Sequence, residues 1–180
     1  VSGFHTDPVG LLLSHRADWA IVSDVEQNDD VLFKPLFSYE MVGICSKDHP
    51  LANKDVWQAE DFAEETWVTY PVPDDMLDLY RQVLKPKGIN PPRRTTELTI
   101  ALIQLVASRR GIATVPYWAA LPYLEKGYVV ARKITEEGLY SNLYAAIRKE
   151  DANLAYIEDF HQTVKAQSFS TLPGLSVLEL

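Results

Sequence analysis

The side chains that most often carry enzymatic chemistry are few and scattered in this sequence. Its single cysteine, Cys45, lies in an apolar run, where a thiol is more often inert core than a nucleophile. Ser14 and His15 are sequence neighbours on an expected helix, so their side chains diverge. The four histidines show no metal-ligand spacing, and no G-x-G-x-x-G, Walker lysine or G-x-S-x-G motif occurs. The sequence therefore predicts no catalytic residue, no metal site and no cofactor.

Hydroxyl and carboxylate side chains at expected element ends suit binding better than catalysis. Thr99 opens an apolar helical pattern, and 70–72 (Tyr70, Pro71 and Val72) precede another helix. Helix N-termini offer backbone N–H groups to an anion, and a hydroxyl cap can assist them. Asp24, after Ser23, ends a strand and could attract an ammonium. Each of these residues could equally be a structural cap without a ligand.

The segment "GIATVPYW" predicts a buried strand that ends in Pro116, Tyr117 and Trp118. In α/β folds, small molecules bind beyond the carboxyl ends of such strands. Pro116 and Trp118 are therefore candidate binding residues. The alternative is that the aromatic rings cover the core beneath the next loop.

Helical and extended patterns alternate along the chain. Asp7 is an expected N-cap, followed by Pro8 at the first helical position. The run 19–22 is typical of a strand buried on both faces of a parallel sheet. Gly111 is the expected C-terminal stop of the helix that begins at Thr99. The other expected strands cover 39–47, 66–72, 93–99, 111–116, 128–134 and 142–149, and the other helices begin near Asp75 and cover 153–167, the latter with Leu154, Ile157, Phe160 and Val164 inward. This alternation predicts a doubly wound α/β fold.

Composition narrows the possible partners. With 180 residues, 47% of them hydrophobic, the chain can bury one core or two small ones. A formal net charge of -8 gives no attraction for DNA or an anionic membrane, so the chain should not bind DNA unaided. One cysteine excludes an internal disulfide framework, which favours the cytoplasm. Because the chain opens on "VSGFHTDPVG", without a start methionine, we expect it to be part of a longer protein.

Four segments in this order resemble the effector-binding domain of LysR-type transcriptional regulators: "SHRADWAIVSD", "FKPLFSYEMVGICSKDHPLA", "EDFAEETWVTYP" and "LIQLVASRRGIATVP". The resemblance covers nearly the whole chain. Arg109 and Arg110 depart from it, because most members have small residues followed by glycine there. The segments "VSGFHTDP", "TYPVPDDMLDLYR", "TELTIALIQLVASRRGIA" and "EGLYSNLYAAIR" are most similar to the homocysteine-responsive activators of methionine biosynthesis within this family.

The resemblance implies two doubly wound α/β lobes of the type II periplasmic-binding-protein kind, joined by two crossover strands. The first lobe would comprise 1–45 plus 146–180, with its own first strand and helix lying upstream, and the second lobe would comprise 46–145. DNA binding would need a winged helix-turn-helix that this chain lacks. The full-length protein would be a homodimer or homotetramer without a membrane segment.

The resemblance also implies a small amino-acid effector, with homocysteine the best candidate, in the cleft between the lobes. Thr99 would then serve its carboxylate and Asp24 its ammonium, while Phe4 and Trp118 contact the sulfur chain. His5 and Thr6 fall in a segment that commonly lines the pocket of the family. Two alternatives share the architecture: an extracytoplasmic amino-acid carrier, and an enzyme similar to prephenate dehydratase.

Overall fold

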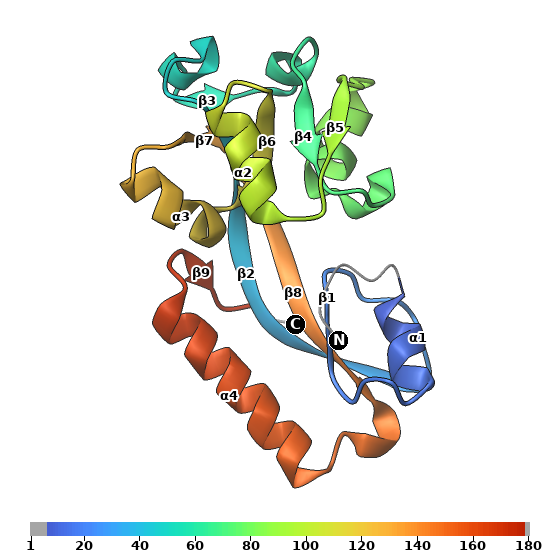
Figure 1. The fold of residues 1–180 in the computed structure, drawn as a ribbon. Coiled ribbons are helices and arrows are strands. Elements are labelled where there is room, and N and C mark those ends of the chain that lie inside the picture. Colours follow the sequence, from blue (N-terminus) through green and yellow to red (C-terminus); the bar gives the residue numbers. More distant parts are fainter. Residues whose placement is uncertain (1–6, 179–180) are drawn as a thin grey trace. The chain divides into compact units, whose positions relative to one another are not determined.

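The computed structural model describes residues 7–178 and divides the chain into two compact units (Figure 1). Unit 1 comprises residues 1–39 and 141–180, and unit 2 comprises residues 40–140. The chain passes from one unit to the other inside two strands, β2 (Val31–Cys45) and β8 (Leu139–Arg148).

Unit 1 holds a sheet with the strand order β1-β8-β2, in which β1 (Ala20–Val22) is antiparallel to β8. The short strand β9 (Leu175–Ser176) pairs with β2 through Ser38 and Tyr39. Two helices belong to this unit, α1 (Pro8–Leu13) and α4 (Ala155–Thr171). The Asp7 carboxylate accepts a hydrogen bond of 2.7 Å from the Gly10 N–H, which confirms the predicted N-cap.

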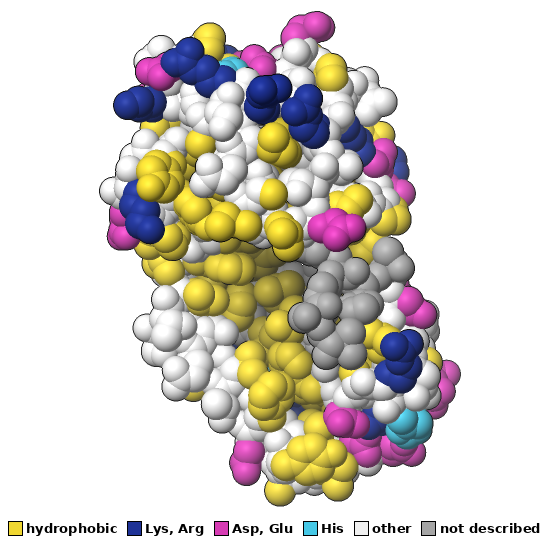
Figure 2. Space-filling model, viewed as in Figure 1, with side chains coloured by type: hydrophobic (Ala, Val, Ile, Leu, Met, Phe, Trp, Pro, Cys, Tyr) yellow, Lys and Arg dark blue, Asp and Glu magenta, His cyan; other side chains and the backbone are white. Residues whose placement is uncertain are grey.

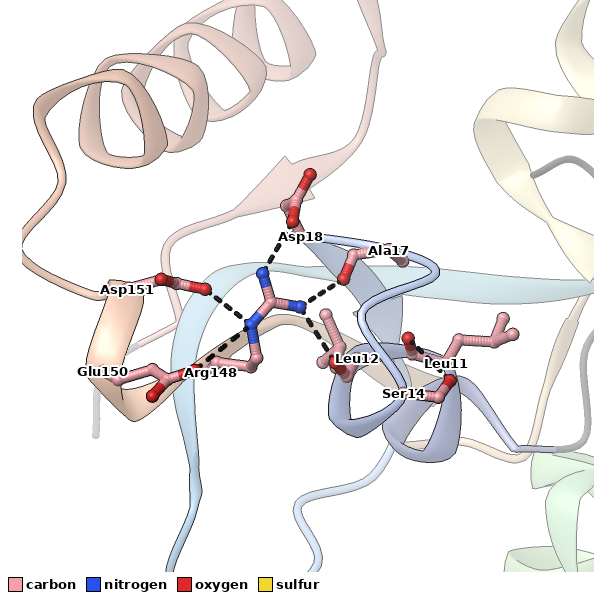
Figure 3. Close-up of polar contacts among 8 residues, drawn as sticks. All are labelled: Leu11, Leu12, Ser14, Ala17, Asp18, Arg148, Glu150 and Asp151. Atoms are coloured by element: carbon pink, nitrogen blue, oxygen red, sulfur yellow. Dashed lines mark hydrogen bonds and ion pairs between the residues drawn. The ribbon is translucent and has the colours of Figure 1, made fainter.

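Arg148, at the end of β8, joins three segments of unit 1 (Figure 3). Its Nη1 donates to the carbonyl oxygens of Leu12, 2.8 Å away, and Ala17. Its Nη2 and Nε donate to the carboxylates of Asp18 and Asp151. The side chain is only 7% exposed, so this guanidinium fixes the end of α1, the following loop and the short 3-10 turn after β8.

Unit 2 is built on three parallel strands, β4 (Trp67–Thr69), β5 (Arg93–Thr95) and β6 (Ile112–Pro116). The later part of β2 runs antiparallel to β6 and also pairs with β7 (Val130–Ile134), which is parallel to β3 (Val56–Trp57). The helices α2 (Thr99–Ala107) and α3 (Tyr117–Glu125) follow β5 and β6. One apolar cluster of this unit contains Trp57, Phe62 and Trp67, and another joins α2 to β2, β4 and β6.

Short helical turns fill the connections. They are 3-10 turns at η1 (Pro50–Asn53), η2 (Ala59–Phe62), η3 (Asp74–Met76), η5 (Lys85–Lys87) and η6 (Lys149–Asp151), with a π-helical turn at η4 (Tyr80–Leu84). A single helix was predicted from Asp75, but this segment contains two 3-10 turns, η3 and η5, with the π-helical turn η4 between them. It ends, as predicted, at Gly88, which takes the left-handed conformation.

Other expectations about individual elements were wrong. The strand 19–22 was expected inside a parallel sheet, whereas β1 is antiparallel to β8 and Ile21 is 52% exposed. In α4 the buried side chains are Ile157 and His161, while Leu154 and Phe160 are exposed. Phe160 instead packs edge-on against Trp19, with ring centroids 5.2 Å apart.

The predicted stop of α2 was also wrong. Gly111 was expected as its left-handed C-terminal residue, but Arg109 takes that conformation with φ 58°. The N–H groups of Arg109 and Arg110 bond to the carbonyls of Val106 and Leu105, which completes a Schellman motif. Gly111 is required for a different reason, since a Cβ there would lie 2.2 Å from the carbonyl oxygen of Thr66.

Candidate functional site

One edge of the unit 2 sheet gathers the polar and aromatic candidates of that unit. The parallel strands β4 and β6 pair Trp67 with Ile112, so their carboxyl ends lie side by side. Tyr70 directly follows β4, and Pro116 is the last residue of β6. The helices α2 and α3 both begin at this edge, which is where ligands bind in open α/β sheets.

Tyr70 and Thr99 meet at this edge through their side chains. The phenol oxygen lies 2.7 Å from the Thr99 Oγ1, and either hydroxyl can donate the hydrogen bond. Burial raises the pKa of Tyr70, and the hydrogen bond from Thr99 partly offsets that effect, so the phenol is protonated at neutral pH. Two residues 29 positions apart in the sequence therefore present one polar pair.

Thr99 is the first residue of α2 and not its N-cap. Leu98 takes the N-cap position, with extended backbone and no capping side chain. The first intrahelical bond runs from the Leu102 N–H to the Leu98 carbonyl at 3.0 Å. The N–H groups of 99–101 consequently have no acceptor within the helix, which gives this end its affinity for an anion.

Apolar side chains surround the start of α2. Leu98 is 62% exposed and Ile100 is 56% exposed, one on each side of Thr99. Figure 2 shows both yellow hydrophobic side chains and a magenta acidic side chain at this end of unit 2, whereas dark blue Lys and Arg side chains gather at its opposite end. Met41 faces Pro116 across the antiparallel pair of β2 and β6, and it was not a predicted site residue.

Sequence reasoning missed these apolar neighbours for two reasons. Leu98 and Ile100 were not predicted as site residues, although an apolar residue on each side of a hydroxyl at a helix start was a usable signal. The place of Met41 depends on strand register, which the sequence does not show.

The remaining unit 2 candidates lie close to the same strand ends. Pro71 is exposed and Val72 half-buried in the turn after β4, where the Val72 N–H bonds to the Tyr70 carbonyl at 2.9 Å. Pro116 caps α3, and Trp118 lies half-buried in the first turn of that helix. Tyr117 and Trp118 thus begin a helix that was not predicted, and Tyr117 packs from that helix against the apolar cluster of α2, β2, β4 and β6.

The other predicted site residues are not part of unit 2. Ser23, half-buried, and Asp24, exposed, follow β1 in unit 1. Phe4, His5 and Thr6 fall outside the described residues.

Within residues 7–178, the two candidate nucleophiles Ser14 and Cys45 are hydrogen-bonded and buried, respectively. The Ser14 hydroxyl donates to the Gly10 carbonyl at 2.7 Å. Burial raises the pKa of the Cys45 thiol to about 11, which keeps it protonated and unreactive at neutral pH. His49, which precedes Pro50, accepts a hydrogen bond from the Leu51 N–H at a turn. No group of three or more metal-binding side chains occurs in this part of the chain.

The geometry at the start of α2 is suited to holding a small anion beside an apolar group. Three helix N–H groups and a hydroxyl pair supply donors, while Leu98 and Ile100 supply apolar surface.

Among the described helices, none is both long enough and apolar enough to cross a bilayer.

Comparison with known proteins agrees with this architecture. Residues 1–168 match the family model of the LysR substrate binding domain. The transcriptional regulator MetR of Haemophilus influenzae is 86% identical over 180 residues, which are 100% of this chain and 58% of that protein. MetR of Escherichia coli K12 is 36% identical over 178 residues, covering 99% of this chain and 56% of that protein.

Solved structures give the same result. The regulatory domain of MetR, a LysR family regulator from N. meningitidis, superposes with a TM-score of 0.92 and 65% identity, covering 99% of this chain and 83% of that one. The effector-binding domain of QuiR in complex with shikimate matches with a TM-score of 0.73 at 24% identity over 88% of this chain and 77% of that one, which shows a shared fold alone.

The fold is the type II periplasmic-binding-protein-like fold of LysR regulatory domains. The relatives are named transcriptional regulators, and the chain spans little more than half the length of the MetR proteins it matches. The chain belongs to the LysR substrate-binding domain family.

Proposed function

We propose that this chain is the effector-sensing domain of a transcriptional regulator that binds homocysteine and controls methionine-biosynthesis genes. The observation that carries the proposal is the hydrogen-bonded pair of Tyr70 and Thr99 at the N-terminus of α2. The high identity to MetR proteins makes a regulator the favoured class over an amino-acid carrier or a prephenate dehydratase-like enzyme.

The carboxylate of the amino acid would accept hydrogen bonds from the first N–H groups of α2 and from the Thr99 hydroxyl. Tyr70 would orient that hydroxyl, because a phenol that donates to Oγ1 leaves the threonine proton for the ligand. The sulfur chain would contact Leu98 and Ile100, with Trp118 as a further candidate.

For Asp24 and Phe4 we propose the same roles that the family resemblance implies. Asp24 is the candidate partner of the ligand ammonium, and Phe4 the second candidate partner of the sulfur. The proposed effector acts on transcription by binding one state of the regulator more tightly than another, since only that difference shifts an equilibrium. DNA would be bound in the cytoplasm by another part of a homodimeric or homotetrameric protein.

Calorimetry on the intact protein with L-homocysteine, L-methionine and L-serine tests the ligand. We expect homocysteine to bind most tightly. A Thr99→Ala variant should lose roughly tenfold to a hundredfold in affinity, because a hydrogen bond to a charged group contributes about 1.5–3 kcal/mol.

The matched control is Thr95→Ala, which removes an exposed threonine hydroxyl at the end of β5. Its affinity should equal that of the wild type. Equal binding of the three amino acids would reject homocysteine as the effector, and an unchanged affinity in Thr99→Ala would reject the start of α2 as the carboxylate site.

A further inference from the structure

A second group of polar atoms in unit 2 has no hydrogen-bond acceptor among residues 7–178. Arg93, the first residue of β5, has its Nε and Nη2 atoms buried without a hydrogen-bond partner among the described residues. The indole Nε1 of Trp67, which is fully buried, has none either. Trp67 and Arg93 are directly paired in the register of β4 and β5, so these donors belong to neighbouring residues. Leaving such donors unsatisfied is costly, which makes a bound acceptor the favoured explanation.

Aromatic rings hold the Arg93 guanidinium in place. Its Cζ lies 5.1 Å from the ring centroid of Trp67 and 5.0 Å from that of Tyr80. Tyr80 begins the π-helical turn η4, a form of helix that often marks functional sites. Stacking against two rings restricts the plane of the guanidinium, so its N–H groups have a defined direction.

Among the described residues, only Asp74 accepts a hydrogen bond from this guanidinium. Nη1 donates to the carboxylate of Asp74 in the η3 turn, and that carboxylate is 48% exposed. Nε–H and Nη2–H lie along a different edge and point the same way. This edge matches the two oxygens of one carboxylate or phosphate group, which accept the two bonds in parallel.

The group is separate from the start of α2. Trp67 and Arg93 lie at the amino ends of β4 and β5, whereas Tyr70 follows the carboxyl end of β4. Tyr70 is three positions after Trp67 along an extended stretch of chain, which corresponds to about 10 Å at roughly 3.3 Å per residue. A ligand at one place therefore leaves the donors of the other untouched.

We propose that Arg93 and Trp67 form a second binding site in unit 2, for a small oxyanion that accepts two hydrogen bonds from the Nε–Nη2 edge of Arg93. The exposed Asp74 carboxylate competes with that ligand for the guanidinium charge. Carboxylate and phosphate oxyanions share the required geometry, and the experiment distinguishes them.

Thermal unfolding of the intact protein in acetate, inorganic phosphate or chloride, at one ionic strength, tests the site. Acetate or phosphate should raise Tm in a saturable manner relative to chloride, and the more effective one identifies the oxyanion. Arg93→Lys keeps the charge but removes the two-donor edge, so the apparent affinity should fall at least tenfold. Asp74→Asn removes the competing charge, so the affinity should rise.

Arg94→Lys is the matched control, because Arg94 is the next residue of β5 and is exposed without a described polar partner. It should bind the oxyanion as the wild type does. The proposal fails if neither oxyanion raises Tm above chloride, if Arg93→Lys responds like Arg94→Lys, or if Asp74→Asn weakens the response. Homocysteine binding to Arg93→Lys is measured in parallel, and its retention separates this site from the one proposed at α2.

Discussion

The thiol of Cys45 lies inside the apolar cluster of Trp57 and Phe62, at the end of β2. Burial is the main reason that its pKa rises from 9.0 to about 11, while Arg132 acts in the opposite direction. The thiol therefore ionises at lower pH in the unfolded chain. Its contribution to stability is fully present below pH 9.0 and is lost as the pH rises through about 11.

Cys45→Ala should remove this pH dependence. Between pH 8 and pH 11 the wild type should lose about 2–3 kcal/mol of unfolding free energy more than the variant, because each pKa unit corresponds to about 1.4 kcal/mol. Urea unfolding at several pH values measures both proteins, and the small cavity of the variant adds only a constant offset. Parallel pH profiles would contradict the assigned burial of the thiol.

The residue types of the candidate site could be predicted, but their partners could not. Thr99 was chosen as a hydroxyl at a helix start, and Tyr70 because 70–72 precede another expected helix. Their mutual hydrogen bond depends on how α2 packs against β4, which a single sequence does not determine. The same limit applies to Arg93, because its stacking on Trp67 and Tyr80 follows from strand register.

Helix ends in this chain use the left-handed conformation with and without glycine. His15 ends α1 with φ 55° and Arg109 ends α2 with φ 58°, whereas Gly127 ends α3 with φ 68°. All three complete Schellman motifs, since the following residue bonds back to the last turn of each helix. A side chain makes this conformation unfavourable, so the first two helix ends carry avoidable strain.

His15→Gly and Arg109→Gly should each raise the unfolding free energy by about 0.5–1 kcal/mol. Arg109→Gly also removes an ion pair with Asp48, but both side chains are more than half exposed, so that loss is small. Gly127→Ala is the reverse change and should destabilise the protein by about 1 kcal/mol. Denaturant unfolding of the three variants decides, and a loss of stability in both glycine variants would show that the side chains contribute contacts.

Element types were easier to predict than their packing. Apolar periodicity located α2, β6 and β8 because each of these buries a continuous apolar pattern. The helix α3 was missed because Pro122 lies inside it, where proline usually ends a helix. The buried face of α4 was misjudged because His161, a polar residue, occupies a position that is 4% exposed.

Arg148 holds unit 1 together across more than 130 sequence positions. Its loss would leave the carbonyls of Leu12 and Ala17 and the carboxylate of Asp151 without their donor. Breaking a buried charged network in this way typically costs about 3–5 kcal/mol. The loss of stability should be confined to unit 1, because the described partners of Arg148 all belong to it.

Hydrogen exchange on an Arg148→Met variant measures that confinement. Amides of residues 8–22 and 141–171 should exchange faster than in the wild type, while those of α2 and β6 keep their protection. Arg109→Met, at an exposed arginine, is the control and should leave both regions unchanged. Equal acceleration in unit 2 would show that the two units unfold as one cooperative body.

The fold class could be predicted for the whole chain, because helices and strands alternate and four segments resemble one family. The antiparallel pairing of β1 with β8 could not, since a strand of three residues gives no signal of direction. The 15-residue length of β2 was underestimated because Lys34 and Pro35 interrupt its apolar pattern.

Unit 2 is one continuous stretch of chain, whereas unit 1 is assembled from segments on both sides of it. During synthesis, unit 2 is complete once residue 140 has left the ribosome, and Arg148 with α4 emerges only afterwards. The order of translation therefore favours folding of unit 2 first. If synthesis pauses when unit 2 is complete, β1 has no paired strand, because most of its partner β8 has not yet been synthesised. The unpaired strands of unit 1 would then be exposed to chaperones.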